Sequence, residues 1–235
     1  MSVAVVADAH LGGPGGPAEG LSDQLLSLSQ KGCCHLVILG DLFHVWVGSE
    51  RFETPDIRVI SQVLRQLRSD GMRIDYVEGN RDFFIGHSSY ADLFDLVATE
   101  STFTVGGKRY LAVHGDRLND ADWLYRSWRS VSKSRASRFF MMHLPRFLAH
   151  RLIHSTERGL AKTNFKHRMI VPEKMILRYA RSRLGEDHDV LLLGHFHESR
   201  RWAVPGGTVW LVDAWFRSRR VEILGDECVA DKKAT

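Results

Sequence analysis

Short apolar segments alternate with amphipathic segments along most of the chain, and this pattern predicts its secondary structure. Helical periodicity marks Leu21–Gln30, Pro55–Ser69 and Pro172–Arg183, and Gly71 is placed to end the second of these helices. The alternation of strands with helices favours an α/β fold in which helices cover a sheet. Seven apolar runs have the length of strands: Val3–Ala7, His35–Leu39, Arg73–Val77, Arg109–Val113, Val190–Leu193, Val209–Val212 and Arg220–Leu224.

Two segments depart from this alternation. Ser101–Tyr110 predicts a β-hairpin that turns at Gly106 and Gly107. Residues at about 123–170 interrupt the pattern before the last predicted helix, and we interpret them as an inserted helical cap, or lid. The prediction is therefore a single domain of residues 1–235 that carries one helical insertion.

Charge is distributed unevenly along the chain. The 235 residues include 32 Lys+Arg and 28 Asp+Glu, which gives a net charge of +4. Residues 123–183 hold 15 of the basic and 2 of the acidic residues, a charge of +13, and the rest of the chain has a charge of −9. Phe139, Phe140, Phe147 and Leu148 lie among these basic residues. Basic amphipathic helices bind nucleic acid, anionic lipid or an acidic partner, and they also form solvated faces of globular proteins.

Composition excludes several classes of protein. A hydrophobic content of 44% is typical of a globular protein and excludes a disordered chain. No apolar run approaches the roughly 18 residues of a membrane-spanning helix, and no Lys or Arg precedes Lys31, as a secretory signal would require. The three cysteines, with Cys33 next to Cys34, form no disulfide framework. We therefore expect a protein of a reducing compartment, the cytoplasm.

Polar motifs follow five of the predicted strands. Open α/β sheets bind ligands beyond the carboxyl ends of their strands, so motifs in this position are expected to meet at one edge. Any single motif of this kind is common by chance, whereas five in this arrangement predict a functional site. The motifs are Asp8-Ala9-His10, Gly40-Asp41, Gly79-Asn80-Arg81-Asp82, His114-Gly115-Asp116 and Gly194-His195-Phe196-His197.

The side chains of the five motifs are typical of a metal site without thiolates. Mixed nitrogen and oxygen ligands suit Mn²⁺, Fe²⁺, Zn²⁺ or Co²⁺. Asp82 and Asp116 are candidates to orient the ligands, and His44 is expected to have a supporting or surface role. Because the candidate ligands exceed the three or four of a single zinc site, they predict two metal ions. They are Asp8, His10, Asp41, Asn80, His114, His195 and His197.

The order of these motifs resembles that of the calcineurin-like metallophosphoesterases, and the resemblance spans about residues 3–224. It implies a four-layer αββα sandwich, in which helices flank two sheets, and a centre of two divalent metals, for which we favour Mn²⁺. One metal would be bound by Asp8, His10 and His197. The other would be bound by Asn80, His114 and His195, with Asp41 as the bridge.

Within this family the chain is similar to the UDP-2,3-diacylglucosamine diphosphatases of lipid A synthesis. Arg81 stands where protein phosphatases have the His of a G-N-H motif, and Gly40-Asp41-Leu42-Phe43 is followed by Trp46 and Gly48. Ala214-Trp215 also fits this branch. The resemblance implies hydrolysis of the pyrophosphate of a UDP-linked diacylated sugar lipid to UMP and a 2,3-diacylglucosamine 1-phosphate. It also implies a basic, apolar lid over the acyl chains.

The resemblance assigns further contacts and partners. Asn80, Arg81 and His195 would be catalytic residues that also bind the phosphates, and Asp122 would contact the sugar. The implied partners are the UDP-lipid and an anionic membrane surface, which would place the protein at the periphery of the inner membrane on its cytoplasmic face. No stable nucleic-acid partner is expected, and the sequence leaves the oligomeric state open.

The insertion departs from the pattern of that branch. The branch has Ser-x3-Asn-x2-Lys, and the best alignment places Leu160, Asn164 and His167 at these positions, so that only Asn164 is kept. Lys166 lies nearby and could supply the missing cation, since Lys carries a charge that a neutral His lacks. This departure bears on the identity of the lipid substrate and leaves the hydrolytic chemistry unchanged.

Two other functions remain open at this point. A metallophosphoesterase that acts on nucleotides or nucleic acid would use the basic segment for phosphates, and Trp123, Tyr125 and Trp128 for stacking on bases. A scaffold that keeps the fold without catalysis is the other alternative. Loss of metal ligands is expected in such a scaffold, whereas all seven candidate ligands are present in this chain.

Overall fold

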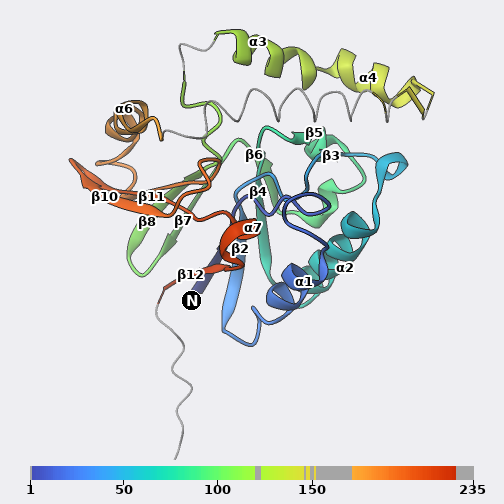
Figure 1. The fold of residues 1–235 in the computed structure, drawn as a ribbon. Helices are drawn as coiled ribbons and strands as arrows, with labels where there is room; N and C mark the ends of the chain where they lie inside the picture. Colours follow the sequence, from blue (N-terminus) through green and yellow to red (C-terminus); the bar gives the residue numbers. More distant parts are fainter. Residues whose placement is uncertain (1, 120–122, 146, 149–150, 152–170, 226–235) are drawn as a thin grey trace, which may run out of the picture.

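The computed structural model describes residues 2–119, 123–145, 147–148, 151 and 171–225. Two five-stranded sheets pack face to face, and helices cover the outer face of each sheet (Figure 1). The four-layer αββα sandwich predicted for this chain is therefore confirmed. The assignment of the whole chain to one domain with an insertion stays a prediction.

The first sheet is mostly parallel and is buried on both faces. Because both faces pack against other layers, its strands are nearly continuous apolar runs, as the burial of every residue of β1 illustrates. Four strands run parallel, and the last strand pairs antiparallel to β1 at one edge. In spatial order the strands are β12 (Glu222–Leu224), β1 (Ser2–Val6), β2 (Cys33–Ile38), β4 (Arg73–Val77) and β6 (Leu96–Ala98).

The second sheet has a parallel centre and antiparallel edges. The predicted hairpin is confirmed, and its turn residues Gly106 and Gly107 both have positive φ, which glycine adopts at no steric cost. The edge strand Arg200–Val204 escaped prediction because Arg200 and Arg201 break the apolar pattern there. In spatial order the strands are β10 (Arg200–Val204), β11 (Gly207–Leu211), β9 (Val190–Leu193), β8 (Lys108–Val113) and β7 (Glu100–Val105).

Three apolar cores hold the four layers together. One lies between the two sheets, the second lies under α1 (Glu19–Leu26) and α2 (Pro55–Ser69), and the third lies under α6 (Glu173–Arg183). Helix α2 begins where the sequence predicts, because Thr54 Oγ1 accepts a hydrogen bond from the Ile57 N–H and proline occupies the first helical position. The short helix α7 (Trp215–Ser218) follows β11.

Two further helices cross one end of the sandwich. Helices α3 (Trp123–Ser132) and α4 (Arg135–His143) lie above the strand ends and form the described part of the predicted insertion (Figure 1). The rest of that insertion, residues 146, 149–150 and 152–170, lies outside the described residues. The end of α4 is held by Arg51, whose guanidinium donates to the carbonyl of Met142 at 2.6 Å and to that of Leu144.

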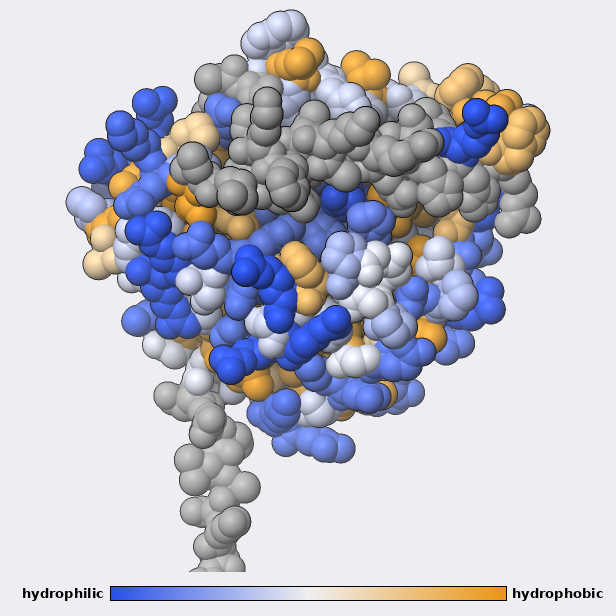
Figure 2. Space-filling view, in the orientation of Figure 1, coloured by the Kyte–Doolittle hydropathy of each residue, from blue (hydrophilic) through white to orange (hydrophobic). Residues whose placement is uncertain are grey.

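Short elements connect this end to the sheets. The two-stranded sheet of β3 (Trp46–Val47) and β5 (Asp82–Phe83) lies beneath α3 and α4, and its residues form an apolar cluster with Trp128 and Met141. Three 3₁₀ helices complete the region: Glu50–Phe52, Ile85–His87 and Ala91–Leu93. Figure 2 shows apolar side chains on the outer surface at this end of the molecule.

A buried ionic cluster joins the two sheets away from the strand ends. The Asp75 carboxylate is fully buried and lies 3.2 Å from His35 Nε2. It accepts hydrogen bonds from Arg73 Nε at 2.9 Å and from Ser101 Oγ at 2.6 Å, and the bond from Ser101 links β4 to β7. Burial alone would raise the pKa of Asp75, but the hydrogen bonds of His35, Arg73 and Ser101 outweigh burial and lower it to about 2. Ionised Asp75 is therefore favoured more in the folded than in the unfolded chain.

We predict that Asp75→Asn lowers the free energy of unfolding by about 2 kcal/mol at pH 7, because the folded chain loses its preference for the ionised carboxylate. The folded pKa is depressed, so this contribution is present above the unfolded value of roughly 4 and is lost as the pH falls through about 2. Urea unfolding at a series of pH values measures this contribution. The difference in free energy of unfolding between wild type and variant is expected to narrow from pH 4 downward.

Asp92→Asn is the matched control, because Asp92 is exposed. Its free energy of unfolding is expected to stay within about 0.5 kcal/mol of wild type at every pH. An Asp75→Asn protein as stable as this control at pH 7 would contradict the role of the cluster.

Candidate metal centre

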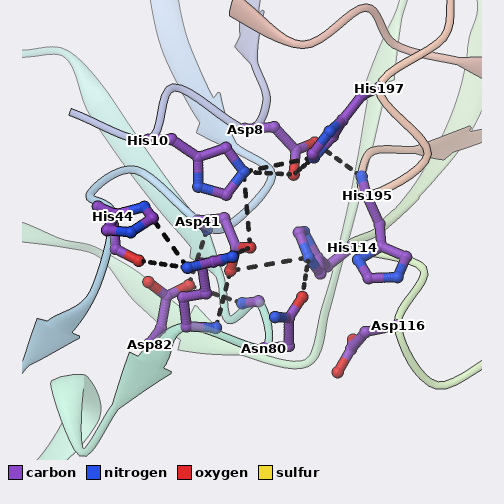
Figure 3. Close-up of polar contacts among 12 residues, drawn as sticks. Asp8, His10, Asp41, His44, Asn80, Asp82, His114, Asp116, His195 and His197 are labelled. Carbon is purple, nitrogen blue, oxygen red and sulfur yellow. Dashed lines mark hydrogen bonds and ion pairs between the residues drawn. The ribbon is translucent and has the colours of Figure 1, made fainter. Parts of the chain in front are cut away.

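Five loops meet at the end of the sandwich beneath α3 and α4. They follow β1, β2 and β4 of the first sheet and β8 and β9 of the second, so the centre lies where the two sheets adjoin (Figure 3). All seven candidate ligands are brought together there, and all except the half-buried His195 are buried. Their positions match the expectation, and their role as ligands stays a prediction.

One group of ligand atoms surrounds Asp8. Asp8 Oδ1 lies 3.3 Å from His197 Nε2 and 3.8 Å from His10 Nε2, and the two imidazole nitrogens are 3.3 Å apart. Residues 8 and 10 come from the loop after β1, while residue 197 comes from the loop after β9. The three atoms are close enough together to bind one cation, and this is the set that the family resemblance implies for one metal.

A second group surrounds His114. His114 Nδ1 lies 2.6 Å from the Leu39 carbonyl, which fixes the proton on Nδ1 and leaves the Nε2 lone pair directed into the site. Nε2 lies 3.3 Å from Asn80 Oδ1 and 3.8 Å from Asp41 Oδ1. The His195 ring stacks edge to face on His114, with centroids 5.1 Å apart.

Asp41 lies between the two groups. Its Oδ1 faces His114, and its Oδ2 lies 4.0 Å from His10 Nε2. Asp8 also adjoins both groups, because Asp8, Asp41 and His114 form a second set with mutually close ligand atoms. The orientation of the Asp41 carboxylate supports the predicted bridge.

The backbone at the centre adopts an unusual conformation that the sequence did not reveal. Five of the candidate ligands have φ in the left-handed region, between 47° and 67°. This region is strained for most residues, and Asp, Asn and His enter it more readily than other non-glycine types. Strain of this kind is concentrated at functional sites, where it directs side chains that a regular strand would turn away. The five are Asp8, His10, Asp41, His195 and His197.

Carboxylates tie four of the five loops together in two pairs through backbone amides. Asp8 Oδ2 accepts the His195 N–H at 2.7 Å, and Asp41 Oδ1 accepts the Arg81 N–H at 2.8 Å. Asp82 Oδ2 accepts both the Gly79 N–H at 2.7 Å and the Asp41 N–H at 3.0 Å. Asp82, which is expected to orient ligands, thus fixes the backbone of its own loop and of the loop after β2.

The buried charges strongly perturb one another. Burial raises the pKa of Asp8, but the nearby imidazole of His197, together with those of His114 and His10, outweighs burial and holds the pKa below its usual range. Burial raises the pKa of Asp41, an effect that the charge of Asp8 reinforces. Burial, together with the charge of His114, lowers the pKa of His195 to about 3. His195 is therefore neutral at pH 7, the form that a metal ligand requires.

The donor set fits divalent cations. Asp8 Oδ1 is buried and accepts no hydrogen bond from any described residue, although it faces two imidazoles. Two carboxylates buried together are costly unless positive charge accompanies them. Imidazole, carboxylate and amide oxygen in this proportion suit a divalent transition metal.

The remaining predicted residues are placed as follows. Arg81 is buried beside Asp41, with Nε 3.7 Å from Asp41 Oδ2, and its Nη1 donates to the His44 carbonyl at 3.0 Å. The His44 ring lies near Arg81 and His10, in agreement with a supporting role. Asp116 points away from the His114 ring and pairs with residues of α3 (Figure 3). The other named positions, Asp122, Leu160, Asn164, Lys166 and His167, lie outside the described residues.

An apolar cavity of about 450 Å³ adjoins the centre. It extends between the β3–β5 sheet and helices α3 and α4, and Val45 and Phe83 bring its wall within two residues of His44 and Arg81. This cavity was not predictable from the sequence, because its two walls are far apart along the chain. Its lining consists of Val45, Val47, Phe83, Phe84, Trp128, Ser132, Ala136, Ser137, Phe140 and Met141.

No model of a protein family matches the chain. A UDP-2,3-diacylglucosamine hydrolase of Pseudomonas fluorescens is 31% identical over 181 residues, which cover 75% of this chain and 70% of that protein. The chain belongs to the UDP-2,3-diacylglucosamine hydrolase family. The resemblance identified from the five motifs is thereby confirmed.

Other members of the UDP-2,3-diacylglucosamine hydrolase family match shorter or more divergent stretches. The protein of Pseudomonas entomophila is 39% identical over 111 residues, 47% of this chain and 46% of its own length, so the match spans about half of that relative. The protein of Ralstonia nicotianae is 28% identical over 194 residues, 77% of this chain and 71% of its own length.

Solved structures resemble the chain more distantly. Vps29 of Chaetomium thermophilum has a TM-score of 0.47 at 12% identity, covering 91% of this chain and 71% of that one. An archaeal phosphodiesterase has a TM-score of 0.45 at 12% identity, covering 95% of this chain and 93% of that one.

We predict that His10→Asn reduces the number of Mn²⁺ ions bound per chain, because the variant loses the imidazole nitrogen that faces Asp8 and His197. Calorimetric titration of metal-free protein measures the change, and circular dichroism checks that the variant is folded. His87→Asn is the control, because His87 is exposed and outside the centre. Unchanged Mn²⁺ binding by His10→Asn would show that the ligand assignment is wrong.

Proposed function

We propose that the protein hydrolyses the pyrophosphate bond of a UDP-linked diacylated sugar lipid, releasing UMP and the lipid sugar 1-phosphate. The observation that carries this proposal is the position of the cavity, which brings an apolar chamber to the edge of a centre suited to two divalent cations. A substrate with a pyrophosphate next to acyl chains matches both halves of this arrangement. The names of the relatives support the same substrate.

The chemistry divides between the metals and the protein side chains. Two divalent metals, for which we propose Mn²⁺, would supply a nucleophilic water at neutral pH and polarise the phosphoryl oxygens. Asn80 and His195 would position the phosphate, and the Arg81 guanidinium would offset charge that develops on its oxygens. The water oxygen forms a bond to the uridine-side phosphorus as the bond from that phosphorus to the bridging oxygen breaks. The bridging oxygen leaves with the sugar phosphate.

Helices α3 and α4 are suited to an anionic lipid surface. Their outward side chains include Trp123, which is 72% exposed, and Phe139, which is 67% exposed, beside the exposed cations Arg126 and Arg135. Each cation near an anionic surface contributes about 1 kcal/mol of attraction, and aromatic residues favour the interface. None of the helices within the described residues is long and apolar enough to span a membrane. We propose the periphery of the inner membrane, on its cytoplasmic face, as the location of the protein.

The two alternative functions are less well supported. A stacking platform for nucleic acid needs exposed aromatic rings, yet Trp128 lines the apolar cavity and Tyr125 donates a hydrogen bond to Asp116 at 2.5 Å. Only Trp123 of the three is largely exposed. A non-catalytic scaffold would have no need of seven converging ligand residues, five of which have a strained backbone.

We predict that the Mn²⁺-supplemented protein releases UMP from UDP-2,3-diacylglucosamine in preference to cyclic nucleotides and single-stranded DNA. In Ala136→Trp an indole fills part of the cavity, so the KM for the diacylated substrate is expected to rise at least about tenfold. Hydrolysis of bis-p-nitrophenyl phosphate, which has no acyl chain, should be unchanged in this variant. Both reactions are followed as initial rates.

Ser127→Trp is the matched control for this experiment. Ser127 is exposed on α3 and does not line the cavity, so its variant should keep the wild-type KM for the diacylated substrate. Preference for a nucleotide or DNA substrate would overturn the proposed function. A wild-type KM in Ala136→Trp would instead show that the cavity does not bind the acyl chains.

We predict that the protein binds vesicles containing phosphatidylglycerol at low salt and is released by high salt, which screens the charges. Trp123→Ser/Phe139→Ser should reduce the fraction that floats with the vesicles, because both exposed rings are lost. Ile223→Ser is the control, since Ile223 is 38% exposed on β12, far from α3 and α4 (Figure 1). Protein that stays entirely out of the vesicle fraction at low salt would contradict membrane association.

A further inference from the structure

Two cations from the insertion converge on one carbonyl group of the metal centre. Arg129 Nη1 donates to the Gly79 carbonyl at 3.2 Å, and Lys133 Nζ donates to the same oxygen at 2.7 Å. Arg129 belongs to α3, and Lys133 follows the last residue of that helix. Both side chains thus reach from the basic segment into the protein, whereas other described cations of that segment, such as Arg126 and Arg135, are exposed.

Arg129 also holds a second loop of the centre. Its Nη1 lies 2.6 Å from Asp116 Oδ2, which in addition accepts the hydroxyl of Tyr125 at 2.5 Å. The Arg129 and Asp116 side chains are only 10% and 3% exposed, so solvent screens this pair little. Asp116 is two residues beyond His114. One guanidinium therefore connects the loop after β4 to the loop after β8.

The Gly79 peptide leaves little room for adjustment. Its N–H is fixed by Asp82 Oδ2 at 2.7 Å, and a Cβ at this position would overlap Asp41 Oδ1. Its carbonyl is the group that Arg129 and Lys133 hold. Since Asn80 is the next residue, the orientation of its side chain depends on that carbonyl being held.

We propose that Arg129 and Lys133, with Asp116, form a clamp on the Gly79 carbonyl that positions Asn80 relative to His114. Because of this Gly79 clamp, the predicted metal subsite of Asn80, His114 and His195 depends on α3, although α3 supplies no ligand to that subsite. The subsite of Asp8, His10 and His197 comes from other loops and does not depend on the clamp. Arg129 and Lys133 are positioning residues, and the inference rests on the proposed metal centre.

The test is calorimetric titration of metal-free protein with Mn²⁺, which requires no substrate. Arg129→Met keeps an unbranched apolar side chain and removes the donors, so it should weaken one of the two binding steps by about tenfold or more, as loss of groups that orient ligands typically does. The affected step should be the one that Asn80→Ala weakens. The other step should keep its wild-type affinity, which excludes a general loss of structure as the cause.

Two further variants complete the design. Lys133→Met removes the second donor at Gly79 and leaves the Asp116 pair intact, so it should weaken the same step less, and it decides the question should Arg129→Met fold poorly. Arg181→Met on α6 is the control, because it removes the same charge at an exposed position far from the centre. This control should bind both ions as the wild type does.

The outcomes distinguish failure of the clamp proposal from failure of the proposed function. Retention of both binding steps in Arg129→Met and Lys133→Met, or equal weakening of both steps, overturns the clamp. A wild-type protein that binds two Mn²⁺ ions but releases no UMP from the diacylated substrate overturns the proposed function alone. Where hydrolysis is observed, Arg129→Met should lower kcat for bis-p-nitrophenyl phosphate, a substrate that makes no use of the cavity, and Arg129→Lys should recover part of it.

Discussion

Three buried carboxylates, each accepting a hydrogen bond from the backbone of another loop, are the constraint on which the functional end of this protein depends. Asp8 holds the loop after β9, Asp41 holds the loop after β4, and Asp82 holds the loop after β2. A buried carboxylate that lost its donors would pay the full cost of desolvation, so these bonds and the positions of the loops are maintained together. The loops are thereby fixed before any cation binds, at the cost of concentrating negative charge that only cations or imidazoles can balance.

The topology of the sandwich explains why these loops meet. Parallel strands in each sheet carry their carboxyl ends to the same edge, and the face-to-face packing of the sheets brings the two edges together. The loops of the first sheet carry the candidate ligands Asp8, His10, Asp41 and Asn80, while those of the second sheet carry His114, His195 and His197. The centre is therefore formed only when both sheets have folded and docked. The Asp75 cluster, which joins β4 to β7, secures the same interface away from the centre.

Much of this architecture was predictable from the local pattern of apolar and polar residues. Val190–Leu193 and Pro55–Ser69 are observed as predicted, because an uninterrupted apolar run and a capped amphipathic segment specify their own structure. The gathering of seven polar residues was predictable because each follows a strand. Features that depend on distant parts of the chain were not predictable. The approach of Arg129 to Gly79 joins residues 50 positions apart, and the cavity forms between segments separated by more than 40 residues.

The left-handed backbone at five candidate ligands has a consequence for how the centre can change during evolution or in the laboratory. A substitution at Asp8 or His197 must satisfy the backbone as well as the cation, because φ lies near 50° at both positions. Asparagine meets both demands, whereas a β-branched residue is excluded by the backbone whatever it could coordinate. Fewer residue types can therefore replace these candidate ligands than the preference of the metal alone would allow. Asn80 and His114 have no such restriction and are the positions where a new ligand type could be introduced with least strain.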